Sequence, residues 1–100
     1  MTLRILESAM IDLCAARLFY ERQGAGLGAY FFDSVFADID SLVHSAGIHP
    51  VFLRYHRLLA KRFPYAVYYT VKDDSVCVWR VLDERRDPRR NRRALRNPSA

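Results

Sequence analysis

The chain has 100 residues, of which 51% are hydrophobic and 13% aromatic. A chain of this length buries about two-thirds of its unfolded surface, so it has room for one core, and its aromatic content excludes intrinsic disorder. No apolar run approaches the roughly 20 residues that a membrane-spanning helix needs. Glu7 and Asp12 interrupt the apolar stretch at the N-terminus, which is atypical of a secretory signal. We therefore expect one cytoplasmic domain with no membrane partner.

The net charge of +5 is distributed unevenly along the chain. Residues 1–50 carry three basic and six acidic side chains, whereas residues 84–100 carry seven arginines against two acidic residues. All basic residues except Lys61 and Lys72 are arginines, whose planar guanidinium group favours paired contacts with phosphate or carboxylate. The second half of the chain is therefore predicted to face an anionic partner, either nucleic acid or an acidic protein segment.

The first half predicts a strand followed by two helices. Thr2–Leu6 alternates weakly, as a short strand does. Ser8 is a candidate N-cap for a helix that ends near Gln23, before a glycine-rich link. The apolar side chains of this helix recur at three- and four-residue steps, at Met10, Leu13, Ala16 and Tyr20.

A second, longer helix is expected from about Leu27 to Ala46, ending at Gly47. Its apolar stripe consists of Leu27, Phe31, Val35, Ile39, Leu42 and Ala46. The short link predicts an antiparallel hairpin of the two helices. Phe32, Phe36 and Val43 lie off this stripe. They indicate either a wide face packed on a sheet or an exposed groove for a partner.

The second half changes to a period of two, typical of strands. We predict strands at Tyr55–Phe63, Tyr65–Val71 and Val76–Asp83, the last two joined by a turn at 72–75. Pairing Lys72 with Ser75 predicts four cross-strand pairs, Tyr69–Val78, Val67–Arg80, Tyr68–Trp79 and Thr70–Cys77. Arg80 favours its own side as the open face of the sheet. The predicted architecture is a two-layer α+β domain, with a short strand, a helical hairpin and a three-stranded antiparallel meander.

Residues 89–100 are expected to form a basic, mobile tail after a domain at 1–88, with a short helix beyond Pro88 as the alternative. This tail shows no core positions in the pattern. Cys14 and Cys77 lie far apart and match no metal or redox spacing, so we expect reduced thiols packed as small hydrophobic groups. His44 and His49 have no ligand-spaced neighbours, and we expect neither a metal nor a cofactor.

Two stretches make the sequence similar to a known family. The segment from Arg57 to Tyr69, RLLAKRFPYAVYY, and the later RRDP at 85–88 resemble the RelE/ParE superfamily of bacterial toxins. Asp12, Ala16, Tyr20 and the stretch GLGAYFFDSV fit the two helices that precede the sheet in this family. The resemblance extends from about Leu3 to Pro88 and agrees with the order of elements predicted above.

The resemblance implies the toxin of a type II toxin–antitoxin module, neutralised by a cognate antitoxin protein. Relatives resembling ParE inhibit DNA gyrase without cutting nucleic acid, whereas relatives resembling RelE cut messenger RNA on the ribosome. Cleavage at a 2′-hydroxyl needs an acid–base pair as well as cations. After Trp79 the sequence has neither tyrosine nor histidine. This favours the ParE branch and gyrase as the target, with a ribosome-dependent endoribonuclease and an inactive, antitoxin-binding member as alternatives.

The candidate site residues come mainly from the basic strands. His56, Arg57 and Arg80 are the weak catalytic candidates, with Glu84 behind His56 as a titratable group. The residues expected to bind the target or the antitoxin are Arg54, Arg57, Lys61, Arg62, Arg80, Arg85 and Arg86, together with the apolar anchors Phe32 and Phe36.

Overall fold

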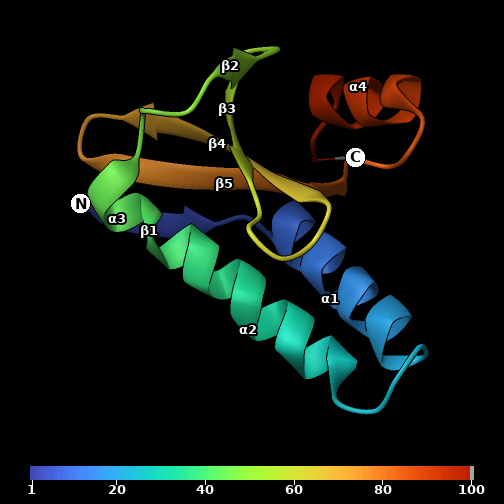
Figure 1. Ribbon diagram of the computed structural model, residues 1–100. Helices are drawn as coiled ribbons and strands as arrows, with labels where there is room; N and C mark the ends of the chain where they lie inside the picture. Colours follow the sequence, from blue (N-terminus) through green and yellow to red (C-terminus); the bar gives the residue numbers. More distant parts are fainter. Residues whose placement is uncertain (100) are drawn as a thin grey trace.

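The computed structural model describes residues 1–99 and contains a five-stranded sheet in the order β1-β5-β4-β3-β2 (Figure 1). The first part of the chain forms β1 (Thr2–Ile5), α1 (Glu7–Glu21), α2 (Leu27–Asp40) and α3 (Leu42–Ser45). The second part forms β2 (Val51–Phe52), β3 (Tyr55–Leu59), β4 (Tyr65–Lys72), β5 (Ser75–Asp83) and α4 (Pro88–Arg96). β1 pairs parallel to β5, and the other neighbours pair antiparallel. The predicted α+β architecture is confirmed.

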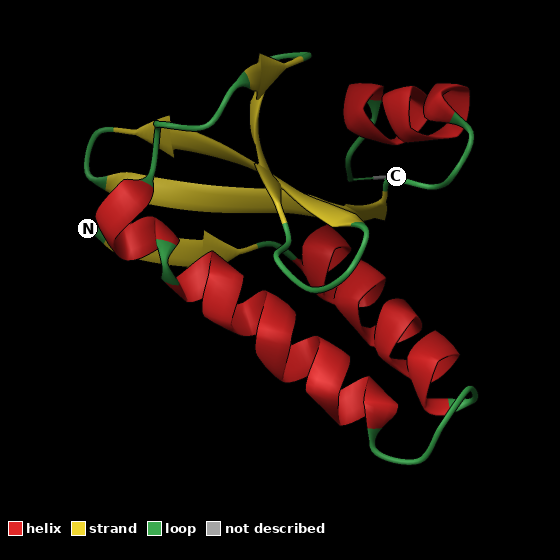
Figure 2. Ribbon diagram, viewed as in Figure 1, coloured by secondary structure: helices red, strands yellow, loops and turns green. Residues whose placement is uncertain are grey.

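The helical hairpin forms one layer against the sheet, with α1 and α2 side by side (Figure 2). Its core joins Leu13, Phe31 and Ile39 of the helices to Val67 and Val78 of the sheet. The two helices approach closely at Gly28, where an added Cβ would lie 2.5 Å from the Arg17 carbonyl oxygen. Only a glycine fits this contact without moving the backbone.

Glu21 at the end of α1 caps the beginning of α2. Its two carboxylate oxygens accept hydrogen bonds from the Gly26 and Gly28 amides, at 3.0 and 2.9 Å. These amide bonds, which favour the ionised form, lower the pKa of Glu21. Ser8, the predicted cap of α1, has another role, because α1 begins at Glu7 and the Ser8 hydroxyl donates to the Trp79 carbonyl at 2.7 Å.

Two predicted element lengths are wrong. The second helix is interrupted at Ser41, whose hydroxyl donates to the Asp38 carbonyl at 2.6 Å; such serine–backbone bonds bend helices. β3 ends at Leu59 instead of Phe63, and Phe63 turns into the core, 4.9 Å from the Phe31 ring centre. The Lys61 amide donates to Asp38 at 3.1 Å, which draws the loop after β3 toward α2.

Two of the four predicted cross-strand pairs in the β4–β5 hairpin are correct. The pairs Tyr69–Val78 and Thr70–Cys77 are confirmed. A β-bulge follows, so that Tyr68 pairs with Arg80 and Val67 with Val81, and the predicted pairs Tyr68–Trp79 and Val67–Arg80 are wrong by one residue. The extra residue is Trp79, because Val78 and Arg80 hold consecutive partners on β4.

The second face of the sheet is covered by α4, on the side away from α1 and α2 (Figure 1). Leu95 of α4 is 1% exposed and packs with Tyr55, Tyr68 and Leu82. The Tyr55 hydroxyl donates to the Leu95 carbonyl at 3.0 Å. The prediction that residues 89–100 hold no core position is therefore wrong, and the alternative of a helix beyond Pro88 is confirmed.

Two further expectations about exposure are wrong. The face that carries Val67, Tyr69 and Val78 packs under the helical hairpin and is not the open one. Cys14 is exposed rather than packed, whereas Cys77 is half-buried; both thiols are free. Among residues 1–99, no helix combines the length and the apolar character needed to cross a bilayer.

Candidate functional site

A cleft of about 270 Å³ lies between α4 and the second face of the sheet. We call it the α4 cleft; it is lined by Phe52, Arg57, Tyr68, Glu84, Arg86, Pro88, Asn91 and Arg92. Arg57 follows Tyr55 by two residues on β3, so its side chain emerges on the same face as the Tyr55 ring. The chain leaves β5 at Asp83 and returns over the sheet as α4, which brings Glu84 and Arg92 to the same place.

Glu84 is held at the base of this cleft by two donors. The Tyr68 hydroxyl donates to Glu84 Oε2 at 2.9 Å, and Arg57 Nη1 donates to Glu84 Oε1 at 3.3 Å. The Arg57 guanidinium also lies over the Phe52 ring, 5.7 Å from its centre, in a cation–π contact. The Arg57 side chain is still 37% exposed, so it retains donors for a ligand.

Burial raises the pKa of Tyr68 to about 12, and the neighbouring Glu84 carboxylate adds to the shift. Tyr68 is therefore a neutral hydrogen-bond donor at physiological pH. Its hydrogen bond orients the Glu84 carboxylate.

Arginines dominate the rim of the α4 cleft. Arg86 and Arg92 line it, and Arg89, Arg90 and Arg93 are exposed on α4. Asp87 caps this helix, because its carboxylate accepts the Arg89 amide at 2.9 Å, and this bond lowers the pKa of Asp87. The arginines of the cleft and the exposed arginines of α4 together form a positively charged surface that attracts anions, more strongly at low salt.

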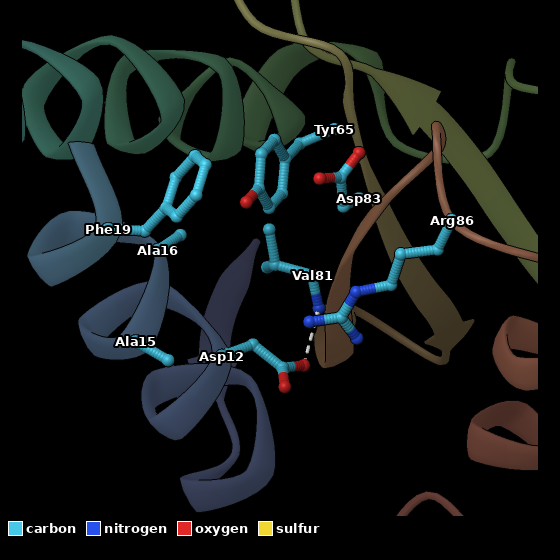
Figure 3. A pocket seen from close by; sticks show the side chains of 8 residues that line it. All are labelled: Asp12, Ala15, Ala16, Phe19, Tyr65, Val81, Asp83 and Arg86. Atoms are coloured by element: carbon cyan, nitrogen blue, oxygen red, sulfur yellow. Dashed lines mark hydrogen bonds between the residues drawn. The ribbon is translucent and has the colours of Figure 1, made fainter. Parts of the chain in front are cut away.

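Arg86 also borders a second cleft of about 240 Å³, between α1 and the end of β5. Figure 3 shows the Arg86 side chain extending toward the region of Asp12, with Tyr65 and Asp83 across the cleft. Burial raises the pKa of Tyr65 to about 12, with a further contribution from Asp83. This second cleft has two carboxylates, Asp12 and Asp83, and a single arginine, whereas the α4 cleft has one carboxylate and three arginines.

Arg80 is not available as a free cation of the sheet. Its Nε and Nη2 donate to the two carboxylate oxygens of Asp12 at 2.7 and 2.9 Å. Asp12 also accepts the Val81 amide at 2.9 Å, the hydrogen bond drawn in Figure 3. The Arg80 and Asp12 side chains are only 15% and 13% exposed. The interpretation of Arg80 as marking the open face is therefore wrong; its bidentate pair fastens α1 to β5.

His56 lies on the opposite face of β3 from Arg57. Its ring stacks on Tyr69 with centres 5.1 Å apart, and its Nδ1 is 2.7 Å from the His49 carbonyl oxygen. His49 in turn bonds the Tyr69 hydroxyl, and burial, with a smaller contribution from His56, lowers the pKa of His49. The structure thus places His56 in an aromatic cluster and does not bring it together with Arg57.

The other predicted site residues are dispersed. Arg54 is exposed in the β2–β3 turn, where its φ is +75°. Arg85 pairs with Asp83 at 2.9 Å. Lys61 and Arg62 are exposed in the loop after β3. Of the predicted binding residues, the structure gathers Arg57 and Arg86 in the α4 cleft.

The two predicted apolar anchors lie on α2, in the helical layer. Phe32 and Phe36 contact each other with ring centres 4.7 Å apart, and both are half-buried against the core. The Arg17 guanidinium lies 5.3 Å from the Phe32 ring centre. These rings therefore lie outside the α4 cleft, and their role in binding a partner stays a prediction.

Sequence reasoning missed Tyr68 and Asn91 as residues of this site, along with the role of Glu84 in holding it together. One signal was present, because Asn91 and Leu95 are four residues apart and share the buried face of α4. The Asn91 amide donates to the Asp83 carbonyl at 2.9 Å, which ties α4 to the end of β5. Within the described residues, no cluster of His, Cys, Asp and Glu side chains has the arrangement of a metal site.

Comparison with known proteins gives a likeness of fold. No protein-family model matches the chain, and no curated protein matches it. Among solved structures, the chain is similar to one from the chromosomal ParDE toxin–antitoxin system of P. aeruginosa, with a TM-score of 0.71 and 20% identity. The alignment covers 81% of this chain and 92% of that chain. The predicted RelE/ParE-like fold is confirmed.

Proposed function

We propose that this protein is the toxin of a type II toxin–antitoxin module, that it inhibits bacterial growth by binding a cellular target, and that a cognate antitoxin neutralises it. The observation that carries the proposal is the fold shared with a chain of a ParDE system, over 81% of the residues. The sequence motifs that resemble this superfamily, FPYAVYY and RRDP, support it independently. DNA gyrase is the target that we favour.

The geometry of the α4 cleft supports binding rather than cleavage. Both oxygens of Glu84 already accept hydrogen bonds from Tyr68 and Arg57, and the raised pKa of Tyr68 makes it a poor proton donor at neutral pH. His56, the histidine candidate, points to the other face of the sheet. What remains is a cationic and aromatic surface, suited to holding an anionic segment of a partner protein.

The alternative activity, ribosome-dependent cleavage of messenger RNA, rests on one specific arrangement. Glu84 lies beside Arg57 in a cleft that Arg86 and Arg92 also line. A carboxylate can accept a proton from a 2′-hydroxyl, and arginines can stabilise the charge that develops on a phosphate. For this reaction Glu84 would first have to leave its two donors.

The antitoxin is expected to present carboxylates to the arginine-rich surface. Charged contacts at such a rim raise the association rate more than the affinity, so apolar contacts must supply most of the binding energy. Phe32 and Phe36 are the proposed anchors for them, as the sequence predicted. Binding to the antitoxin should therefore weaken with salt mainly through slower association.

Inducible expression in bacteria tests the proposal. The wild-type chain should arrest growth, and co-expression of the antitoxin encoded beside it should restore growth. An Arg57→Ala, Arg86→Ala double variant should lose at least about tenfold in toxicity, since 1.4 kcal/mol of lost target binding is tenfold in affinity. Arg4→Ala, at an exposed position on β1 outside the α4 cleft, is the matched control and should remain toxic.

Two outcomes would contradict the proposal. Unaffected growth with the wild-type chain, at a protein level confirmed by immunoblot, would instead favour an inactive member that only binds its antitoxin. Full toxicity of the double variant would show that the α4 cleft does not bind the target.

A further inference from the structure

α1 has an apolar stripe on the face opposite its core contacts. The core face consists of Ala9, Leu13, Ala16 and Tyr20. The opposite face, here the outer stripe, consists of Glu7, Ile11, Cys14, Ala15, Leu18 and Arg22, all exposed and spaced at three- and four-residue steps. Ile11 is 60% exposed and Leu18 58%. A surface helix normally carries polar residues on this face, so the stripe indicates a contact surface.

The outer stripe is self-complementary under a two-fold rotation that reverses the direction of the helix. Rotation about the point between Cys14 and Ala15 exchanges these two residues with each other. The same rotation exchanges Ile11 with Leu18, and Glu7 with Arg22 at the two ends. Each position therefore meets an apolar group of similar size or a charge of opposite sign.

We propose that α1 packs antiparallel against α1 of a second copy of this chain, forming a two-fold symmetric dimer. In such an interface residue i contacts residue j of the partner while j contacts i, and the outer stripe meets this condition at its six positions. Two Glu7–Arg22 pairs flank two Ile11–Leu18 contacts. The small side chains of Cys14 and Ala15 at the centre let the two helix axes approach closely.

Charge complementarity selects a second copy over an anionic partner. The outer stripe carries one negative end and one positive end. The arginines of the α4 cleft are a separate set, because α4 lies on the other side of the sheet from α1 (Figure 1). Another molecule of this chain supplies both opposite charges at the required separation. The proposed dimer goes beyond the proposed function and leaves both α4 clefts uncovered.

The size of the contact predicts a weak dimer. A helix of 15 residues spans about 22 Å, so one helix against another buries less than the roughly 1,000 Å² of a stable interface. Self-association should therefore depend on concentration and reverse on dilution.

Sedimentation velocity of the purified chain over a wide concentration range tests the proposal. The wild-type chain should shift from monomer to dimer as concentration rises. Leu18→Glu should weaken self-association at least tenfold, because it places a charge opposite Ile11 of the partner copy. The matched control is Leu59→Glu, since Leu59 is 56% exposed on β3, and this variant should associate as the wild type does. Adding Ile11→Arg to Leu18→Glu should restore the dimer through two new ion pairs.

Cysteine cross-linking gives an independent measurement. In an Ala15→Cys variant, the new thiol faces Cys14 of the partner, so mild oxidation should give a disulfide-linked dimer in high yield. Asp33→Cys, at an exposed position on α2, should give little. A wild-type chain that stays monomeric at every concentration, or equal yields from the two cysteine variants, would overturn the proposal. A monomer whose Leu18→Glu variant loses antitoxin binding would also overturn it and assign the outer stripe to the antitoxin.

Discussion

The Asp12–Arg80 pair shows how a single residue changes role once its partners are known. Asp12 accepts three hydrogen bonds, two from Arg80 and one from the Val81 amide. Its distance from Arg80 along the chain is 68 residues, so no local pattern indicates the contact. The pair holds α1 to β5 at low exposure, which is a structural role.

We predict that Arg80→Ala lowers the free energy of unfolding by about 2 kcal/mol, because it leaves the Asp12 carboxylate largely shielded from water without its cation. Urea denaturation measures the change. Arg54→Ala, at an exposed turn residue, is the control and should stay within about 0.5 kcal/mol of the wild type. An Arg80→Ala variant as stable as the control would contradict the structural role.

The two tyrosines with a pKa near 12 predict an alkaline loss of stability. The usual tyrosine value is 10.0, and burial raises the pKa of both Tyr65 and Tyr68 in the folded state. Both tyrosines contribute fully to the free energy of unfolding below pH 10. This contribution is lost as the pH rises toward 12, because the tyrosine hydroxyls of the unfolded chain lose their protons at a lower pH than those of the folded chain. The free energy of unfolding should fall by up to about 1.4 kcal/mol per pH unit for each tyrosine.

Denaturation at a series of pH values between 9 and 12 measures this slope. Tyr68→Phe should remove one of the two contributions, and Tyr65→Phe the other, so each variant should show a flatter dependence than the wild type. If the slope is the same in all three proteins, other groups cause the alkaline loss.

At the scale of elements, α4 is a folded part of the domain rather than an appendage. Leu95 fills the second face of the sheet beside Tyr55 and Leu82, and Asn91 bonds the end of β5. The sequence suggested a mobile tail because arginines crowd this segment. Two buried positions four residues apart are too weak a pattern to outweigh so many charges.

We predict that Leu95→Ala lowers the free energy of unfolding by about 2 to 3 kcal/mol, as for other large-to-small changes at buried leucines. Urea denaturation followed by Trp79 fluorescence is the measurement, since Trp79 packs against the same cluster as Leu95. Arg96→Ala on the exposed face of α4 should change little. An equal effect of the two variants would show that α4 does not pack as described.

Periodicity predicted most elements but not their exact connections. The alternation of β4 and β5 identified both strands, yet the bulge at Trp79 shifted the pairs beyond it, because a bulge adds a residue without changing the local pattern. β2 was missed because two residues, Val51 and Phe52, are too few to show alternation. The break at Ser41 depends on side-chain hydrogen bonds that hydrophobic spacing does not reveal.

At the scale of the whole molecule, the sheet separates two different surfaces. The helical hairpin covers one face and α4 covers the other (Figure 2). The arginines of the α4 cleft lie on the α4 side. The charge asymmetry of the sequence predicted an anionic partner for the second half of the chain, which stays a prediction. It could not place Arg57 with Tyr68 and Glu84, because that cluster depends on the path of the chain after β5.

We propose that the α4 cleft binds a protein target and that the chain does not cut RNA. The most direct measurement compares two reactions of the purified chain, DNA supercoiling by gyrase and cleavage of messenger RNA on translating ribosomes. We predict that the wild-type chain inhibits supercoiling and leaves the messenger RNA intact. The Arg57→Ala, Arg86→Ala variant should need at least about a tenfold higher concentration for the same inhibition of supercoiling. Cleavage of the messenger RNA that disappears in a Glu84→Gln variant, with supercoiling unaffected, would contradict the account.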